Sequence, residues 1–461
     1  MAQFMATLND TYSTTPEMAE ILSDGRLLRH MATFEGALAQ AQADAGLIDR
    51  KLAETISAVA GQLSFDEPAL FAEALKGGTL AIPFVKQLTA EVRATNAAAA
   101  ASVHFGATSQ DVIDSAFVLQ LGEALVLIDK DLTRLADAAA KLARTHAKSA
   151  MLGRTLMQPA TPITFGLKAA QWLLGASDAR SRLRARAQEA LVAQLGGAAG
   201  TLGSLGTHGA PTARHLFTRL AALNAYEPAR LAHVEGTPLP WHTRRGALLA
   251  LASELAIATG LAGKIARDVA LMMQFEIGET FEPAEAGRGG SSAMPHKRNP
   301  VRCMLTVSAS LRTPGLMATL LSGMVQEHER ALGGWQSEWG ALPELVKCCA
   351  GALDNMAQTL EGLNVDAQRM RANFDALNGL PMTEMLALAL APNLGRAEAF
   401  ALVEKAAREV SASGKTLADV VKADPAAKAL SASEIDKILD PLNQLGATQE
   451  FIDSALAGWK R

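Results

Sequence analysis

The chain has 461 residues, of which 49% are hydrophobic and 20% are charged, and its formal net charge is −4 at pH 7. This length exceeds one ordinary domain, and the apolar content is enough to bury a large core, which excludes a largely disordered protein. The slightly acidic balance argues against nucleic acid and membrane surfaces as partners, because both favour a basic face. We therefore expect small molecules and other subunits as partners.

Cysteine usage and the first residues indicate a reduced, cytoplasmic compartment. Cys303, Cys348 and Cys349 cannot form a disulfide framework, and their spacing does not suggest a zinc site. The amino-terminal segment MAQFMATLNDTYS lacks the basic start and the apolar core of a secretion signal. The most apolar long window, GALLALASELAIATGLAGK, contains Glu254 and is expected to be a buried bundle helix, not a membrane span.

In chain order, the sequence pattern predicts almost only helix. Long stretches rich in Ala and Leu cover residues 115–149, 166–193, 246–281 and 302–325, and period-two runs typical of strands are scarce. A helix of roughly 30 residues reaches about 45 Å, which suits a bundle that pairs with other subunits. We predict an all-α fold with three helical domains, at residues 1–106, 107–353 and 354–461. The middle domain is the bundle of long helices, with a polar loop at 287–300.

The first polar interruption is HFGATSQDVIDSA, residues 104–116, which places Thr108 and Ser109 at the start of a long helix. Asp111 follows in the first turn. These residues are typical of a helix N-cap with an acidic first turn. Free N–H groups and two hydroxyls at a helix start also suit a carboxylate ligand, so both interpretations stay open.

Two further interruptions contain glycine or proline. GRTLMQPATPITFG, residues 153–166, is expected to be an extended turn that carries Arg154, Thr155 and Gln158. Considered by itself, Gln158 is expected to satisfy turn backbone. GGAAGTLGSLG, residues 196–206, superficially resembles a phosphate-binding loop. It follows a predicted helix instead of a strand and lacks the Walker lysine, so nucleotide binding is not expected.

Histidines and arginines gather in two short motifs. WHTRR, residues 241–245, contains His242 and Arg245, and QEHER, residues 326–330, contains His328 and Arg330. QEHER lacks the two-histidine spacing of a zinc site, and no metal is expected. Each histidine is a candidate proton carrier or carboxylate ligand, and each could equally be a hydrogen-bonded structural residue.

The loop GGSSAMPHKRNP, residues 289–300, resembles the signature GSSxMPxKxNP of the class II fumarase, aspartase, argininosuccinate lyase and adenylosuccinate lyase superfamily. GATSQD and GRTLMQPATP resemble two further regions shared by that superfamily, in the same order. The resemblance implies a homotetramer with a twenty-helix core, in which three subunits contribute to each active site. It also implies addition or elimination next to a carboxylate.

The same resemblance implies roles for individual residues. Ser291 matches the catalytic base, whose alkoxide needs nearby positive charge and backbone donors. Lys297 and Asn299 match the residues that stabilise a dianion-like intermediate. The candidate catalytic residues are therefore Ser291, Lys297 and His242, and the candidate substrate-binding residues are Thr108, Ser109, Arg154, Gln158, Arg245, Asn299, His328 and Arg330.

One position departs from the lyases. Their second region reads GRTH, with a histidine that assists the leaving group, whereas this chain has Leu156. A carboxylate leaving group would not need that histidine. The chain is similar over nearly its whole length to the bacterial carboxymuconate cycloisomerase branch, including PWHT and QEHERxLGxW. That similarity implies lactonisation without a cofactor, because the substrate's own carboxylate adds across its double bond.

Three alternatives stay open. A close variant would accept a sulfonate in place of a carboxylate on the muconate. An amino-group lyase of the adenylosuccinate type is a second possibility, against which Leu156 is the strongest feature. The third is a non-catalytic helical oligomer, and the intact Ser291, Lys297 and Asn299 argue against it.

Overall fold

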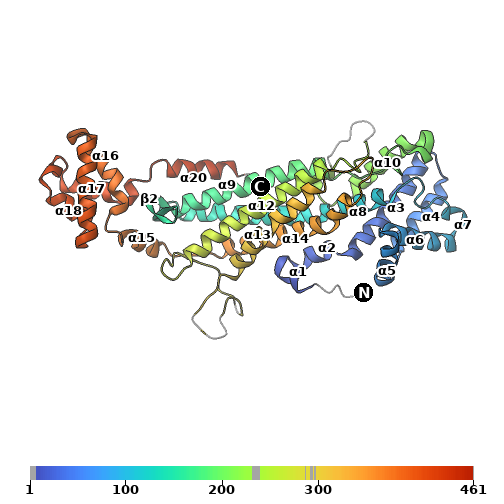
Figure 1. Cartoon of the computed structure of the whole chain (residues 1–461), viewed down its shortest axis with the longest axis horizontal. Coiled ribbons are helices and arrows are strands. Elements are labelled where there is room, and N and C mark those ends of the chain that lie inside the picture. The colour runs from blue at the N-terminus through green and yellow to red at the C-terminus, as the bar shows by residue number, and fades with distance from the viewer. Residues whose placement is uncertain (1–6, 231–238, 286, 291–293, 295–296, 460–461) are drawn as a thin grey trace. The chain divides into compact units, whose positions relative to one another are not determined.

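The computed structural model describes residues 7–230, 239–285, 287–290, 294 and 297–459. Nearly all regular structure in this part of the chain is helical (Figure 1). Its strands form two short two-stranded antiparallel sheets, β1–β2 and β3–β4. The predicted all-α class is confirmed.

The five longest helices of the described chain are α8 (Ser109–Thr145), α9 (Phe165–Ala190), α12 (Gly246–Met272), α13 (Val301–Ser322) and α14 (Gly334–Glu361). The first four match the predicted long stretches to within a few residues at most ends. The prediction missed α14, in which Pro343 lies inside the helix. Proline removes one backbone hydrogen bond, yet α14 continues through it because its apolar face is buried.

Two compact units divide the chain. Unit 1 comprises Met1–Asp131, Ala179–Gly263 and Leu305–Asp354, and unit 2 comprises Leu132–Asp178, Lys264–Met304 and Asn355–Arg461. The division into three domains at 1–106, 107–353 and 354–461 stays a prediction.

Unit 1 contains the amino-terminal helices and their hydrophobic core. Phe34, Leu38, Ile56 and Phe84 are among its fully or almost fully buried side chains. Helix α3 begins after Ser23, whose hydroxyl accepts the N–H of Arg26, as expected of an N-cap. Besides parts of the long helices, this unit has α1 (Leu8–Ser13), α2 (Pro16–Ile21), α3 (Asp24–Asp44), α4 (Arg50–Gln62), α5 (Glu67–Gly77), α6 (Ala81–Thr95), α7 (Ala97–Ala100), η1 (Gly203–His208), α10 (Gly209–Leu223) and α11 (Glu227–Arg230).

Unit 2 contains both sheets and the carboxy-terminal helices. Helices α16 to α19 enclose a separate core that includes Leu386, Leu390, Val403 and Leu417. The elements are β1 (Ala150–Thr155), β2 (Gln158–Thr164), β3 (Thr280–Phe281), β4 (Asn364–Val365), α15 (Ala367–Asp375), η2 (Leu380–Met382), α16 (Thr383–Leu394), α17 (Arg396–Ser413), α18 (Leu417–Ala423), η3 (Pro425–Ala429), α19 (Ala432–Leu439), η4 (Pro441–Asn443) and α20 (Thr448–Gly458).

The segment expected to be an extended turn is a β-hairpin. Thr155 pairs with Gln158, so Leu156 and Met157 form a two-residue turn, with φ of 50° and 65°. Positive φ at both central residues defines the turn that matches the twist of antiparallel strands, although Asn and Gly usually occupy it. Both side chains are exposed, Leu156 to 97% and Met157 to 70%. A large hydrophobic pair at the tip of a hairpin is suited to contact with another molecule.

Helix α12 is, within the described chain, the one helix long and apolar enough to cross a membrane by length and composition. Half of its most apolar window is buried inside the protein. Glu254, within this helix, forms an ion pair with Arg182 at 3.0 Å. A charged pair at that position is typical of a helix packed in a protein bundle, because a membrane interior penalises both charges.

Candidate functional site

The carboxylate of Asp111 organises the start of α8. It is fully buried, and its Oδ2 accepts the backbone N–H groups of Thr108 (3.0 Å) and Gly197 (2.9 Å). Its Oδ1 accepts the N–H of Gly196 (2.9 Å) and lies 2.8 Å from Nε2 of His242. Four partners fix this carboxylate, and the carboxylate in turn fixes the imidazole of His242.

The glycine-rich segment therefore binds an anion that belongs to the chain itself. Gly197 has φ of +68°, and a Cβ there would lie 2.8 Å from the carbonyl oxygen of Gly106. A Cβ on Gly196 would lie 2.8 Å from Cε1 of His242. The loop needs glycine at both positions because a side chain would collide with Gly106 at one position and with Pro240 and His242 at the other.

Gly197→Ala is expected to lower the free energy of unfolding by about 1–3 kcal/mol, because alanine is strained at this φ and its methyl group meets a carbonyl. Urea titration and the thermal midpoint, at fixed protein concentration, measure the loss. Gly260→Ala in α12 is the matched control, since a Cβ there has nothing within 4 Å. Equal midpoints for the two variants would show that the Gly197 conformation is not constrained.

Arg330 adds a cation at the same helix start. Its Nη1 donates to Oγ1 of Thr108 at 2.5 Å. The N–H of Val112 donates to the carbonyl of Thr108 in the first turn of α8. The N–H groups of Ser109 and Gln110 lie before this bond in the chain, where a helix offers them no carbonyl of its own. The positive end of a long helix beside a guanidinium is a suitable place for a carboxylate ligand.

Arg245 directly precedes α12, is almost completely buried, and binds Asp114, which lies one turn beyond Asp111 on α8. Its Nη1 and Nη2 donate to Asp114 at 2.8 and 3.2 Å, and its Nε donates to Glu338 at 3.0 Å, with a second, closer bond from Nη2. Its guanidinium also packs over the ring of Trp241, 4.6 Å from the centroid. Burial lowers the pKa of Arg245, but the two carboxylates outweigh it and raise the pKa above its usual range. All three nitrogens serve internal partners, and a substrate contact for Arg245 stays a prediction.

Asp114 connects further segments to this network. It accepts Nε1–H of Trp335 at 2.9 Å and the amide of Gln194 at 2.6 Å. The side-chain oxygen Oε1 of Gln194 accepts a hydrogen bond from the backbone N–H of Trp241 at 2.5 Å. Sequence reasoning missed Asp114, Gln194 and Glu338 as site-building residues. The spacing of Asp111 and Asp114 on one face of an apolar helix was the one available signal.

In unit 2, Arg154 is held by a residue that the sequence analysis did not consider. Its two terminal nitrogens donate to the fully buried carboxylate of Glu279 at 2.9 and 2.7 Å. Asn373 also donates to Glu279, at 2.9 Å. The Arg154 guanidinium is therefore oriented by an internal ion pair, and Gln158 is exposed on the adjacent strand.

The remaining predicted residues lie on loops. Asn299 donates its backbone N–H to the carbonyl of Gly289 at 2.8 Å, and the Lys297 side chain is exposed. His328 is exposed with φ of 47°. Ser291 lies outside the described residues. In unit 1, the side chains of Thr108, His242 and Arg330 thus lie around the start of α8, where Ser109 is the first helical residue. Arg245 of the same unit binds Asp114, one turn further along that helix. The predicted residues that belong to unit 2 are Arg154, Gln158, Lys297 and Asn299.

A second histidine close to α8 carries a pH-dependent contribution to stability. Nδ1 of His104 lies 2.5 Å from Oε1 of the buried Glu35. Burial lowers the pKa of His104, but the charge of Glu35 and the hydrogen bond outweigh it, so the pKa is raised. The charged pair therefore stabilises the fold fully below the unfolded-state pKa of about 6.5 and loses this effect as pH rises through the raised folded-state pKa.

We expect the thermal midpoint of the native protein to exceed that of His104→Gln most at acidic pH, and the difference to shrink as pH rises. Thermal scans of both proteins from weakly acidic to alkaline pH measure this difference. His215→Gln, at an exposed position of α10, is the control for replacement of a histidine. A difference that stays constant across the range would contradict the assignment of a charged His104.

Comparison with known proteins identifies the class. Residues 10–315 match a protein family described as Lyase, and residues 379–455 match one described as Adenylosuccinate lyase C-terminus. The chain belongs to the lyase family, as its signature loop predicts.

Among its relatives, a 3-carboxy-cis,cis-muconate cycloisomerase from Pseudomonas aeruginosa is 44% identical over 98% of this chain and 96% of the relative. A nitrosuccinate lyase from Streptomyces davaonensis is 41% identical over 98% of this chain and 94% of the relative. Among solved structures, this chain matches the crystal structure of a 3-carboxy-cis,cis-muconate lactonizing enzyme from Pseudomonas putida with a TM-score of 0.90. The two sequences are 40% identical, and the match covers 98% of this chain and 99% of the chain in that structure.

Proposed function

We propose that this chain catalyses the intramolecular lactonisation of 3-carboxy-cis,cis-muconate to 4-carboxymuconolactone, a step of protocatechuate breakdown. The observation that carries the proposal is the 44% identity, over 98% of the chain, to a cycloisomerase of that name. The departure at Leu156 supports it, because a reaction that closes a ring through a carboxylate needs no proton for a departing amine or hydroxide.

Each bond change has a proposed agent. A substrate carboxylate oxygen forms the new C–O bond at one alkene carbon, and the other carbon gains a proton. Ser291 would donate that proton and would accept it in the reverse direction. The substrate supplies its own nucleophile, so the protein contributes orientation, the proton and stabilisation of charge.

Charge on the substrate requires several fixed cations and N–H donors. Arg330, bonded to Thr108 at the start of α8, would bind one carboxylate together with the N–H groups of that helix end. Lys297 and Asn299 would stabilise the charge that develops at another carboxylate. His242, held by Asp111, would act as a hydrogen-bond partner or proton carrier of fixed orientation. The order of events needs no metal or other cofactor.

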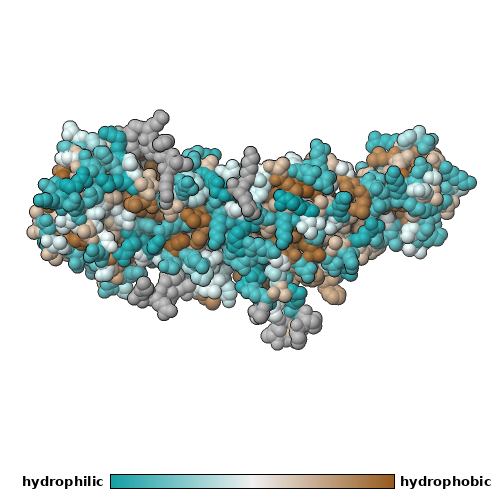
Figure 2. All heavy atoms as spheres, turned by 180° about the vertical axis from the view of Figure 1, so that it is seen from behind, coloured by the Kyte–Doolittle hydropathy of each residue, from teal (hydrophilic) through white to brown (hydrophobic). Residues whose placement is uncertain are grey.

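A homotetramer with shared active sites is the proposed active form, in the cytoplasm. Exposed hydrophobic side chains on the long helices support an assembly, including Ile257 (49%), Leu311 (65%) and Leu321 (51%). Figure 2 shows hydrophobic residues gathered in patches on one face of the molecule. Free, buried cysteines are compatible with a reducing compartment.

The assay that tests the activity follows the diene absorption of the substrate. Freshly prepared 3-carboxy-cis,cis-muconate is expected to lose its ultraviolet absorption when enzyme is added, because lactonisation removes one of the two conjugated double bonds. Parallel reactions with 3-sulfomuconate and adenylosuccinate rank the close variant and the amino-group lyase. Unchanged absorption at micromolar enzyme, with a verified tetramer, would reject the proposed reaction.

Nitrosuccinate belongs in the same panel, because the 41% identity to a nitrosuccinate lyase favours a second candidate reaction. Elimination of nitrite, like departure of a carboxylate, releases a weakly basic anion. Leu156 is therefore equally compatible with this chemistry and does not separate the two candidates. Release of nitrite from nitrosuccinate, with no turnover of the muconate, would assign the chain to elimination.

A further inference from the structure

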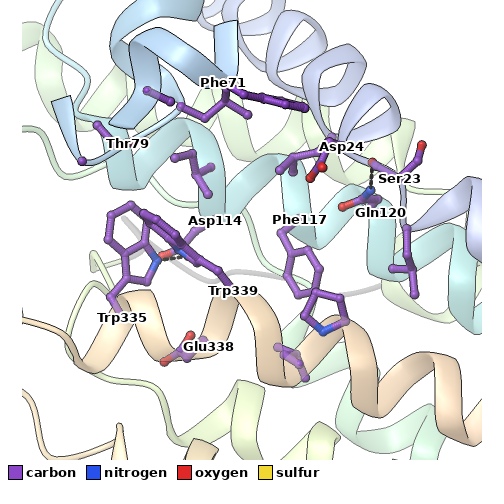
Figure 3. A pocket seen from close by; sticks show the side chains of 18 of the residues that line it. Ser23, Asp24, Phe71, Thr79, Asp114, Phe117, Gln120, Trp335, Glu338 and Trp339 are labelled. Carbon is purple, nitrogen blue, oxygen red and sulfur yellow. Dashed lines mark hydrogen bonds between the residues drawn. The ribbon is translucent and has the colours of Figure 1, made fainter. Parts of the chain in front are cut away.

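A cavity of about 410 Å³ lies within unit 1, between α3, α5, α8 and α14 (Figure 3). Phe71, Phe117, Trp335 and Trp339 contribute aromatic rings to its walls. The two tryptophan rings meet edge to face, with centroids 4.8 Å apart. The volume and the aromatic lining are those of a small-molecule site.

The charged groups of the lining are predominantly carboxylates. Asp24, Asp114 and Glu338 line the cavity together with one guanidinium, that of Arg245. Asp114 and Glu338 share this guanidinium, so one positive charge faces two negative ones before Asp24 is counted. Burial raises the pKa of Asp24, although the charge of Lys347, which donates to Asp10 at 2.7 Å, acts in the opposite direction. With all groups ionised, the lining has three negative charges and one positive charge, a net of −2.

Burial also affects the ionisation of Glu338. Glu338 is 4% exposed, and burial raises its pKa even though Arg245 bonds to it, with the charge of Asp114 acting in the same direction as burial. The largest cause is burial itself, which disfavours the ionised form of a carboxyl group. A cation in the cavity would favour the ionised form of Glu338.

We propose that this cavity binds a small organic cation, of the quaternary ammonium type, with its charge facing the carboxylates and its methyl groups against the aromatic rings. Aromatic faces attract such cations through their quadrupole, and a poorly hydrated cation loses little on leaving water. The polyanionic substrate of the proposed reaction would be repelled by the same lining. The cavity is thus a second site, separate from the candidate substrate site at the start of α8. The residues of α8 that line the cavity, from Ile113 to Gln120, follow Asp111, the partner of His242.

The test compares choline with its uncharged isostere, the dimethylbutanol in which a carbon replaces the quaternary nitrogen. Isothermal titration calorimetry on the full-length protein is expected to detect choline at millimolar concentration and to give at least about tenfold weaker binding for the alcohol, since the cation–π and charge terms are absent from it. Shape and apolar area are the same in both probes, so charge alone separates them.

Two variants locate the binding. Asp24→Asn removes one carboxylate from a residue at the start of α3 that is not part of the core, and Trp339→Leu keeps apolar volume but removes an aromatic face. Each is expected to weaken choline binding by roughly five- to thirty-fold. Glu17→Gln, on the exposed surface of α2, is the control and is expected to leave binding unchanged.

Equal affinity for choline and the alcohol would overturn the proposal, as would binding that neither Asp24→Asn nor Trp339→Leu weakens, or no binding of choline at millimolar concentration. Circular dichroism of each variant verifies folding. Should Trp339→Leu fail to fold, Asp24→Asn still decides the outcome. The experiment does not involve muconate turnover, so its result is independent of the proposed reaction.

Discussion

Ser291→Ala is expected to lower kcat for muconate lactonisation by at least about 10²- to 10⁴-fold, the usual contribution of a positioned proton donor. The substrate's carboxylate can still approach its double bond, but no group then delivers the proton to carbon. KM should change little, because the proposed ligands of the substrate carboxylates are cations and not this hydroxyl. Initial rates from the diene absorption give both constants, and size-exclusion chromatography with light scattering verifies that the variant keeps the assembly state of the native protein.

Ser322→Ala is the matched control, since this serine is exposed on α13 and donates to the carbonyl of Ala318. Near-native turnover by Ser291→Ala would reject the hydroxyl as proton donor. Mixing inactive Ser291→Ala with inactive Ser109→Ala subunits extends the experiment. Partial recovery after subunit exchange is expected if different subunits supply the two serines to one site, and no recovery after verified exchange would contradict shared sites.

Arg245→Met should be the most destabilising change in the network behind His242. Methionine fills much of the volume, but Asp114 and Glu338 then face each other, buried, without a cation. Removal of one partner from a buried ion pair costs about 3–5 kcal/mol of unfolding free energy. Thermal and urea midpoints at fixed subunit concentration measure the loss, which keeps the contribution of assembly constant.

Arg182→Met is the control for this change, because the Arg182 side chain is 46% exposed and its pair with Glu254 should contribute at most about 1 kcal/mol. Adding Glu338→Gln to Arg245→Met is expected to recover part of the stability, since one of the two uncompensated charges disappears. A loss no larger than that of Arg182→Met, or no recovery in the double variant, would contradict a strongly coupled buried network.

Local pattern was sufficient for the fold class and for the start of α8. Apolar periodicity predicted four of the five long helices, and the polar run at Thr108 and Ser109 marked the amino end of α8 correctly. The prediction missed α14, which contains Pro343, although it included α13, which contains Pro314, so an internal proline does not by itself explain the miss. The sequence also did not predict the hairpin at Leu156, because its turn uses two residues that rarely adopt positive φ.

The partners of the site residues could not be predicted in the same way. His242 and Asp111 are separated by 131 positions in the chain, and Arg154 and Glu279 by 125. Such pairs depend on how the helices pack against one another, and no local sequence pattern specifies that packing. The sequence therefore indicated which side chains are chemically suitable, whereas the structure adds what orients them.

The Asp111 carboxylate has a consequence for inhibitors. It occupies the N–H groups of Gly196 and Gly197 as a tethered ligand, present at an effective concentration that a dissolved anion cannot match. Buffer phosphate, sulfate or product carboxylates should therefore compete only at the cations, such as Arg330, and not at the glycine loop. Inhibition by simple anions is then governed by ionic strength and charge, with little dependence on the shape that a phosphate-binding loop would impose.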